Sequence, residues 1–164
     1  MKKSLCVFKL FVVLAFSAAS LKLYAQPHEN MGAKHILINA AKLTWQGGPA
    51  SLPKGSKIAI LEGDMSKSEP FTVRLMLPPN YKISPHWHPA IEHVTVIQGV
   101  FYMGAGEKFN ENTATKLSVG DFATMPVSYA HYAFTKGKTI IQLHGVGPWG
   151  ITYINEADDP RKNK

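Results

Sequence analysis

Cysteine is almost absent from this sequence, which has one in 164 residues. A single thiol excludes an internal disulfide framework and any zinc finger with cysteine ligands. The one cysteine, Cys6, lies in an N-terminal segment with the features of a signal peptide, so the mature chain would contain no thiol. Catalytic-cysteine mechanisms and thiolate metal sites are therefore excluded as well.

Several other signatures are also missing. The sequence has no Gly-x-Ser-x-Gly elbow of a serine hydrolase. The segment 104–106, Gly-Ala-Gly, lacks the third glycine and the helix of a dinucleotide site and fits a hairpin turn instead. Lysine and arginine form no clustered stripe, so we expect no nucleic-acid partner. With 45% hydrophobic and 18% charged residues, the composition is that of a globular domain and excludes wholesale disorder.

The first 25 residues have the three regions of a secretory signal peptide. Lysines come first, at Lys2, Lys3 and Lys9, and an almost unbroken apolar run follows over residues 10–19. A run of about 10 apolar residues is too short to cross a bilayer, because a spanning helix needs about 20. We expect cleavage after Ala25, with Ser20 as the alternative end of the signal peptide, and export to the periplasm or the medium, with no membrane attachment afterwards.

Most of the excess positive charge belongs to this segment. The whole chain has 18 Lys+Arg and 11 Asp+Glu, a net charge of +7. Residues 1–25 contain four lysines and no acidic residue, so the mature chain keeps 14 basic residues against 11 acidic ones, or +3. The basic character is therefore an export feature and does not indicate an acidic partner.

Short runs rich in β-branched and aromatic residues recur through the mature chain between glycine and proline turns. The expected strands are Lys57–Leu61, Phe71–Leu77, His93–Ile97, Val100–Met103, Asp121–Met125, Ala130–Phe134, Thr139–His144 and Ile151–Ile154. This spacing predicts an all-β sandwich or barrel. We expect a β-domain over residues 57–155, an N-terminal extension over 26–56 and a polar C-terminal tail over 156–164.

The stretch from Pro85 to Gly99 carries most of the chemical information. Alternate side chains of an extended strand share a face, so His86 and His88 project the same way. If this alternation survives the turn at Pro89, Glu92 projects with them. Two imidazoles and a carboxylate are donors that a divalent transition metal binds at about 2.0 to 2.2 Å. Buried without a partner, the same groups would carry a desolvation penalty of several kcal/mol.

His93 is an alternative ligand in this stretch. It is one residue out of phase with Glu92, so it should face the opposite side of the strand. If the turn at Pro89 shifts the alternation by one residue, His93 replaces Glu92 as the ligand.

A second segment, residues 120–131, places a turn glycine, a strand, a proline and then a histidine. Together the two segments resemble the two sequence motifs of the cupin superfamily. The residues that match the first motif are His86, His88, Glu92 and Gly99, and those that match the second are Gly120, Pro126 and His131. The resemblance covers about Lys57 to Ile154.

The sequence departs from the cupin motifs at two turn glycines. Asn80 stands where the first motif begins with glycine, and Ser128 replaces the glycine inside the second motif. Both departures fall in turns and not at ligand positions, and asparagine also accepts a positive φ. The ligand positions of the motifs are therefore all retained.

The resemblance implies a double-stranded β-helix, or jelly-roll barrel, that holds one divalent transition metal. Its ligands would be His86, His88, Glu92 and His131. Cupins with this ligand set commonly bind iron, manganese, nickel or zinc, and they include dioxygenases, isomerases and decarboxylases of small organic acids. Four protein ligands would leave one or two positions of a six-coordinate ion open for a small molecule.

Four further residues have two interpretations each. His144 and Gln142 share one face of a strand, where they either contact the substrate or hold a metal ligand in place, or lie on the outer face. Arg74 would hold a substrate carboxylate or form an outward ion pair. Met103 would line the mouth of the pocket or belong to the core.

These observations support one leading hypothesis and two rivals. The chain would be an exported, single-domain metalloprotein that acts on a small organic molecule as an oxygenase, isomerase or decarboxylase. In the first rival, the same metal site belongs to a non-catalytic periplasmic binding or sensing module. In the second, the barrel has lost its metal and serves a structural role or acts as an interaction surface. The partner in the first two cases is a small molecule, and small cupins also often form a homodimer.

Overall fold

A computed structural model describes residues 35–162 of the chain, with the compact unit beginning at Ile36. The predicted signal peptide, residues 1–25, lies outside the described residues. Within the described part of the chain, no helix is long and apolar enough to span a membrane.

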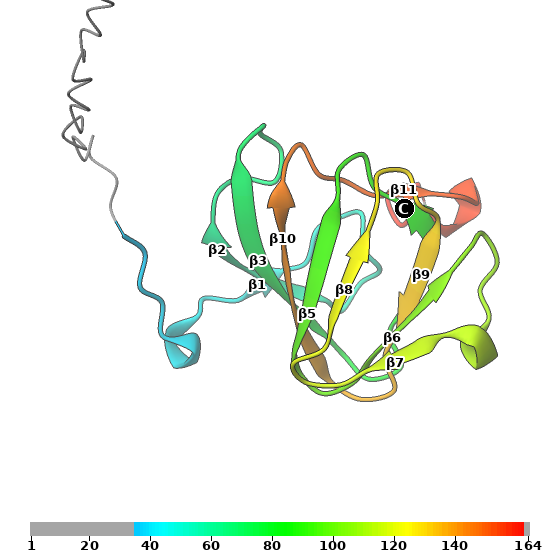
Figure 1. Cartoon of the computed structure of the whole chain (residues 1–164), viewed down its shortest axis with the longest axis horizontal. Coiled ribbons are helices and arrows are strands. Elements are labelled where there is room, and N and C mark those ends of the chain that lie inside the picture. Colours follow the sequence, from blue (N-terminus) through cyan, green and yellow to red (C-terminus); the bar gives the residue numbers. More distant parts are fainter. Residues whose placement is uncertain (1–34, 163–164) are drawn as a thin grey trace, which may run out of the picture. The chain divides into compact units, whose positions relative to one another are not determined.

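The larger of the two antiparallel sheets has six strands (Figure 1). In spatial order they are β1 (Gln46–Gly47), β2 (Lys57–Glu62), β3 (Pro70–Leu77), β10 (Thr139–Val146), β5 (Glu92–Gln98) and β8 (Phe122–Met125). Strand β10 comes late in the chain but lies between β3 and β5. The sheet therefore joins segments that are far apart in the sequence.

The smaller sheet has five strands. In spatial order they are β11 (Thr152–Tyr153), β4 (Lys82–Trp87), β9 (His131–Phe134), β6 (Phe101–Ala105) and β7 (Thr115–Leu117). Strands β4 and β9 pair directly, which brings the two sequence motifs side by side. Together the two antiparallel sheets confirm the predicted all-β class.

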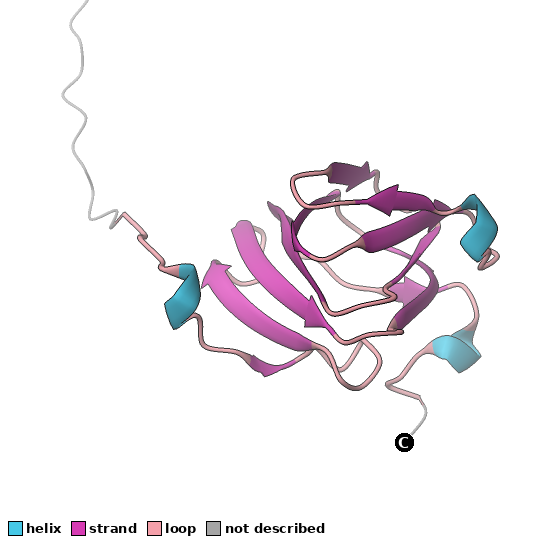
Figure 2. Ribbon diagram, turned by 90° about the horizontal axis from the view of Figure 1, so that it is seen from below, coloured by secondary structure: helices cyan, strands magenta, loops and turns pink. Residues whose placement is uncertain are grey.

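In the described part of the chain, three short 3₁₀ helices lie at the margins of the strand framework (Figure 2). They are η1 (Ala40–Lys42), η2 (Glu111–Thr113) and η3 (Glu156–Asp158). An asparagine precedes each helix, and its side-chain oxygen accepts a hydrogen bond from a backbone N–H two residues further on. This capping satisfies a donor that the first helical turn leaves unpaired.

The hydrophobic core lies on the inner faces of the strands. In β3, the side chains of Phe71, Val73, Leu75 and Leu77 are buried, and the residues between them are more exposed. Strand β10 alternates in the same way, with Ile141 buried and its neighbours less so. Because alternate residues of a strand face opposite sides, the sequence pattern fixes which face of each strand forms the core.

All eight predicted strands overlap observed ones, but β1, β4 and β7 were not predicted. Strands β1 and β7 are only two and three residues long. Strand β4 contains Pro85, and its pairing with β9 shifts between Ile83 and His86, so that Pro85 and His86 are both buried. A proline and a bulge together hide the period-two pattern that identifies a strand.

Both segments that flank the predicted β-domain contribute to the folded unit. In the N-terminal extension, β1 pairs with β2 at the edge of the larger sheet, and Leu52 is buried. In the C-terminal tail, Asp159 is buried and its carboxylate forms an ion pair with Arg161 at 2.7 Å. The same guanidinium donates to the backbone oxygen of Ile151, which ties the tail to the end of the smaller sheet.

Candidate metal centre

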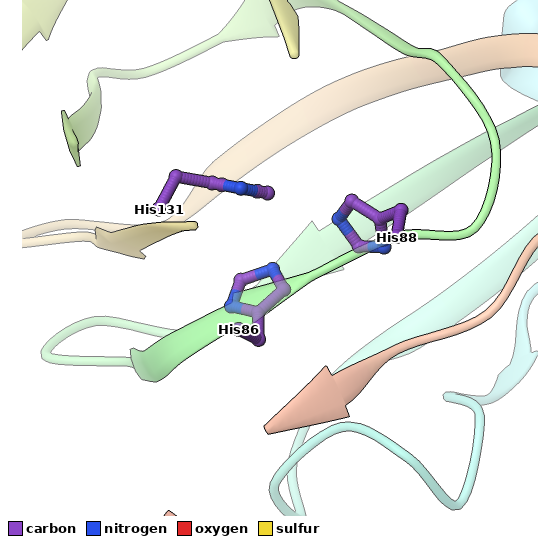
Figure 3. Close-up of side chains that lie close together, drawn as sticks. All are labelled: His86, His88 and His131. Atoms are coloured by element: carbon purple, nitrogen blue, oxygen red, sulfur yellow. The ribbon is translucent and has the colours of Figure 1, made fainter. Parts of the chain in front are cut away.

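Three buried histidines meet between the two sheets. His86 on β4 and His131 on β9 are direct partners in the sheet, and His88 follows at the end of β4. Figure 3 shows the three imidazole rings turned toward one another. Each ring offers one nitrogen, and these atoms all lie within 4.8 Å of one another. The three residues are only 2–3% exposed, so bulk water does not reach this cluster.

Hydrogen bonds to the backbone fix the orientation of all three rings. The Nδ1 atoms of His86, His88 and His131 lie 2.7, 2.7 and 2.9 Å from the backbone oxygens of Ser84, Gly150 and Tyr129, respectively. A carbonyl oxygen only accepts, so each Nδ1 carries the hydrogen and each Nε2 keeps its lone pair. Histidines that bind a metal characteristically have their other nitrogen held in this way.

One of these nitrogen atoms has no hydrogen-bond partner. Nε2 of His88 is buried and unpartnered, although burying an unpaired polar atom is unfavourable. A metal ion bound among the three Nε2 atoms would satisfy it. The donor set of three neutral imidazoles suits a divalent transition metal, so the three histidines could hold such an ion.

Glu92, the first residue of β5, brings the larger sheet into the same site. Its carboxylate is buried, with Oε1 3.4 Å from Nε2 of His88 and Oε2 3.5 Å from Nε2 of His131. Burial alone would raise the pKa of Glu92, but positive charge at the facing Nε2 atoms of His131 and His88, as a proton or a metal ion, outweighs burial and holds the pKa below its ordinary value. Glu92 is therefore an anion beside two of the three histidines.

The site also keeps His86 neutral. Burial and the neighbouring His131 and His88 lower the pKa of His86 to about 3. The imidazole therefore carries no charge near neutral pH, and the neutral form is the one that coordinates a metal.

Two turns with unusual backbone conformations position these strands. Asn80 and Ser128, the residues that replace motif glycines, have φ angles of 55° and 60°. The backbone N–H of Ser128 donates to the backbone oxygen of His88 at 2.9 Å. This hydrogen bond connects the turn before His131 to the segment that carries His88, so the turn helps to set the distance between two candidate ligands.

The motif glycine Gly99 is required for a similar reason. Its φ is 79°, and an added Cβ atom would lie 2.4 Å from the backbone oxygen of Lys138. Glycine is the residue that fits this close approach between β5 and the turn before β10.

A cavity of about 20 Å³ lies against the histidine cluster. Apart from the three histidines and Glu92, its lining is apolar and includes Met103 and Trp149. The indole of Trp149 stacks on the His88 ring, with centroids 4.5 Å apart and planes at 22°. The cavity has the volume of about one water molecule, so the candidate ligands are enclosed by hydrocarbon.

The structure places the other sequence candidates in two groups. Met103 is buried and lines the cavity. Arg74, Gln142 and His144 lie on the outer face of the larger sheet, where Nε of Arg74 donates to Oε1 of Gln142 at 3.1 Å. They alternate with buried residues of β3 and β10, and this alternation points them away from the histidine cluster.

His93 also lies on the outer face, and Glu92 faces inward. The ring of His93 stacks on that of His144, with ring centroids 4.8 Å apart. The alternation along the strand therefore survives the turn at Pro89. His93 does not take the place of Glu92 beside the cluster.

Sequence reasoning missed the groups that orient the histidines. The backbone oxygens of Ser84, Gly150 and Tyr129 carry no signal in the sequence, because any residue type supplies a carbonyl. Tyr153 was also not singled out, although its ring lies 5.8 Å from that of His86 and its hydroxyl donates to the backbone oxygen of Ser51.

Comparison by sequence finds no relative: no family model and no curated protein matches the chain. Comparison by structure finds many similar folds. The polyketide cyclase RemF from Streptomyces resistomycificus matches with a TM-score of 0.63 and 12% identity, covering 79% of this chain and 92% of that chain. A putative acetylacetone dioxygenase from Methylibium petroleiphilum matches with a TM-score of 0.59 and 13% identity, covering 78% and 86%.

An RmlC-like cupin from Shewanella frigidimarina also matches, with a TM-score of 0.54 and 15% identity over 71% of this chain and 94% of that chain. At these identities the likeness establishes the fold. The chain has the double-stranded β-helix fold of the cupins, as its two sequence motifs predict.

Proposed function

We propose that the chain is an exported metalloprotein that binds one divalent transition metal and acts on a small organic molecule. His86, His88 and His131 would be ligands through Nε2, and Glu92 would be the fourth ligand. The metal would be iron, manganese, nickel or zinc. The reaction would be that of an oxygenase, isomerase or decarboxylase.

The hydrogen bonding of the three rings carries this proposal. Three Nδ1 atoms donate to three different backbone oxygens, and the three Nε2 lone pairs that remain are directed into one buried space. A purely structural cluster would be expected to satisfy its own nitrogen atoms, yet Nε2 of His88 has no hydrogen-bond partner. Metal binding accounts for both observations.

The residues of the site would each have a defined part. The three imidazoles, of which His86 is held neutral, and the Glu92 anion would hold the ion, and the anion would offset part of its charge. The apolar lining, with Met103 and Trp149, would exclude water. A bound ion would supply Lewis-acid chemistry or, if it is redox-active, electron transfer to dioxygen.

The size of the cavity limits what enters it. A volume of about 20 Å³ admits a molecule no larger than water, so an organic substrate would enter only as lining side chains such as Trp149 move. The names of two structural neighbours, a polyketide cyclase and a putative acetylacetone dioxygenase, support a small organic substrate.

A non-catalytic binding or sensing module is the second candidate function. Among the residues that line the cavity, the candidate metal ligands are the only ones with an ionisable side chain. Arg74 and His144, the two groups that the sequence offers as further acid, base or anchoring residues, lie on the outer face. General acid–base catalysis needs such a group within reach of the substrate, so its absence from the lining favours binding without turnover.

Metal content would test the site. The untagged mature chain would be stripped with a chelator, reconstituted separately with Fe²⁺, Mn²⁺, Ni²⁺ and Zn²⁺, desalted to remove weakly bound ions, and analysed by plasma mass spectrometry. We expect about one retained equivalent of at least one metal and below about a tenth of an equivalent in His131→Gln. His35→Gln, at an exposed histidine, is the matched control. Equal metal retention in wild type and His131→Gln would refute the site.

Turnover would separate the two functions. The loaded chain would be incubated aerobically with a panel of small diketones and organic acids, with product analysis and calorimetric measurement of binding. Product formation that is lost in His131→Gln would support the enzyme. Binding that depends on the metal but yields no product would support the binding module.

The export proposal needs its own experiment. Its support is the lysine-rich start and short apolar run of residues 1–25. Full-length chain expressed in a Gram-negative host would be fractionated and its intact mass measured. A periplasmic product that begins at Gln26 is expected, and an uncleaved cytoplasmic product would contradict export.

A further inference from the structure

A second pair of histidines lies on the outer face of the larger sheet. His93 on β5 and His144 on β10 are directly opposite each other in the antiparallel register. Their rings are stacked, with centroids 4.8 Å apart and planes at 10°. Side chains directly opposite on one face of such a pair have Cβ atoms about 4.5 to 5.5 Å apart, which is close enough for two imidazoles to share an ion.

We propose that His93 and His144 form a second transition-metal site, which is separate from the buried cluster and open to exchange with solvent. The two imidazoles would chelate one Ni²⁺, Zn²⁺ or Cu²⁺ ion across the two strands. Water or a small ligand would fill the other coordination positions. This site does not depend on the proposed function, because its residues face away from the buried cluster.

The hydrogen bonding of His93 suits this role. Its Nδ1 lies 3.3 Å from the backbone oxygen of His144. A carbonyl oxygen only accepts, so Nδ1 carries the hydrogen and Nε2 keeps its lone pair. A backbone acceptor on the far side of the ring is the arrangement that orients histidine ligands and makes them better donors.

His144 contributes a nitrogen atom that lacks a partner. Its Nδ1 is buried and has no hydrogen-bond partner, which is unfavourable unless another group fills that position. Burial and the neighbouring His93 lower the pKa of His144, so the ring stays neutral near pH 7, in the form that ligates. An imidazole binds a metal in the plane of its ring, so both rings would turn out of the stacked arrangement until Nε2 of His93 and Nδ1 of His144 point at one ion.

An open groove gives an ion access to the pair. Both histidines line a groove of about 420 Å³, together with Phe71, Ile91 and Val146. Within the described part of the chain, the buried histidines are the one set of three metal-binding side chains close enough to share an ion, so the outer pair has no third protein ligand. With only two imidazole ligands, we expect the outer pair to bind a metal more weakly and to exchange it faster than the buried cluster. Among the divalent first-row metals, Cu²⁺ should bind most tightly.

Titration with Ni²⁺ tests this site. Untagged wild type would be compared with His93→Gln, His144→Gln and the double variant by isothermal titration calorimetry, with His35→Gln as the control at an exposed histidine. We expect the dissociation constant of one class of Ni²⁺ sites to rise at least tenfold in each single variant. The double variant should show no further loss of affinity, because chelation needs both rings. The control variant His35→Gln should retain this class of Ni²⁺ sites with unchanged affinity. Unchanged stoichiometry and affinity in the double variant would overturn the proposal.

A second measurement does not require the variants to fold. Wild type would be treated with diethylpyrocarbonate, which modifies accessible imidazoles, with and without Ni²⁺, and the modified peptides would be quantified by mass spectrometry. Ni²⁺ should protect residues 93 and 144 together and leave residue 35 reactive. Modification of residues 93 and 144 at the same rate with and without Ni²⁺ would equally overturn the second site.

Discussion

His86 and His131 are direct partners across strands β4 and β9, and their ring centroids are 4.3 Å apart. The sheet therefore sets the separation of two candidate metal ligands, and no ion is needed to bring them together. Backbone oxygens then fix the orientation of both rings. A metal that binds at such a preorganised site would not first have to order its ligands, which would favour affinity.

Replacing Glu92 with glutamine should weaken metal binding at least tenfold. The amide keeps the size of the side chain but removes the negative charge that lies 3.4 Å from His88 and 3.5 Å from His131. The dissociation constant would be measured by competition with a chromophoric chelator. Glu62→Gln, which alters an exposed carboxylate on β2, should leave the constant unchanged. Equal affinities of wild type and Glu92→Gln would show that Glu92 is not a ligand.

The stability of the metal-free chain should fall in mild acid because of His86. Its pKa is lowered to about 3 in the folded chain, against an ordinary value of 6.5. The unfolded chain therefore takes up the proton first, and the free energy of unfolding decreases as the pH falls from about 6.5 toward about 3. One such group changes the free energy of unfolding by at most about 1.4 kcal/mol per pH unit.

The variant His86→Gln isolates this contribution. Urea unfolding of the metal-free chain between pH 6.5 and 4.5 should show a shallower dependence on pH in the variant than in wild type. Other titrating groups are common to both proteins and cancel in the comparison. Identical slopes would mean that His86 has the same pKa in the folded and unfolded chains.

Trp149 should report metal binding at the buried cluster. Its indole stacks on His88 at 4.5 Å, so a paramagnetic ion such as Co²⁺ held by that histidine should quench its fluorescence. Trp149→Phe should remove most of this quenching at a stability cost below the roughly 3 to 5 kcal/mol of a truncation of tryptophan to alanine. Trp87→Phe, which alters the outward side chain between His86 and His88, should retain it. Strong quenching that persists in the double variant Trp149→Phe/Trp87→Phe would place the ion elsewhere.

Replacing Ser128 with glycine should stabilise the chain by up to about 1 kcal/mol, because a left-handed φ is unfavourable for residues with a Cβ atom. The φ of Ser128 is 60°. Asn80→Gly, at a φ of 55°, should have a smaller effect because asparagine tolerates this region better. Urea unfolding curves would measure both changes. A Ser128→Gly variant that is less stable than wild type would show that the serine side chain stabilises the turn by another route.

The turn residues show how far motif reasoning extends. The sequence identified Asn80 and Ser128 as occupants of glycine positions, and both have a positive φ. This could be predicted because a turn imposes a local backbone conformation that depends on few residues. Strand β4 could not be recognised in the same way, since its proline and its register shift are accommodated only by pairing with β9.

The outer-face residues show where local reasoning stops. Arg74, Gln142 and His144 were candidates for contact with a substrate, and the sequence left open which face of the sheet they occupy. The structure places all three outside, because the residues that alternate with them form the core. The periodicity shows which residues share a face, but only packing against the second sheet decides which face is inside.

By itself, the sequence determined the all-β class, the chemical identity of four candidate donors and their spacing within two segments, because composition and strand alternation are local properties. Tertiary structure decided that the two segments lie on adjacent strands, that Glu92 and not His93 faces the cluster, and which backbone oxygens orient the rings. Those features depend on the pairing and packing of residues far apart in the chain, which no local pattern encodes.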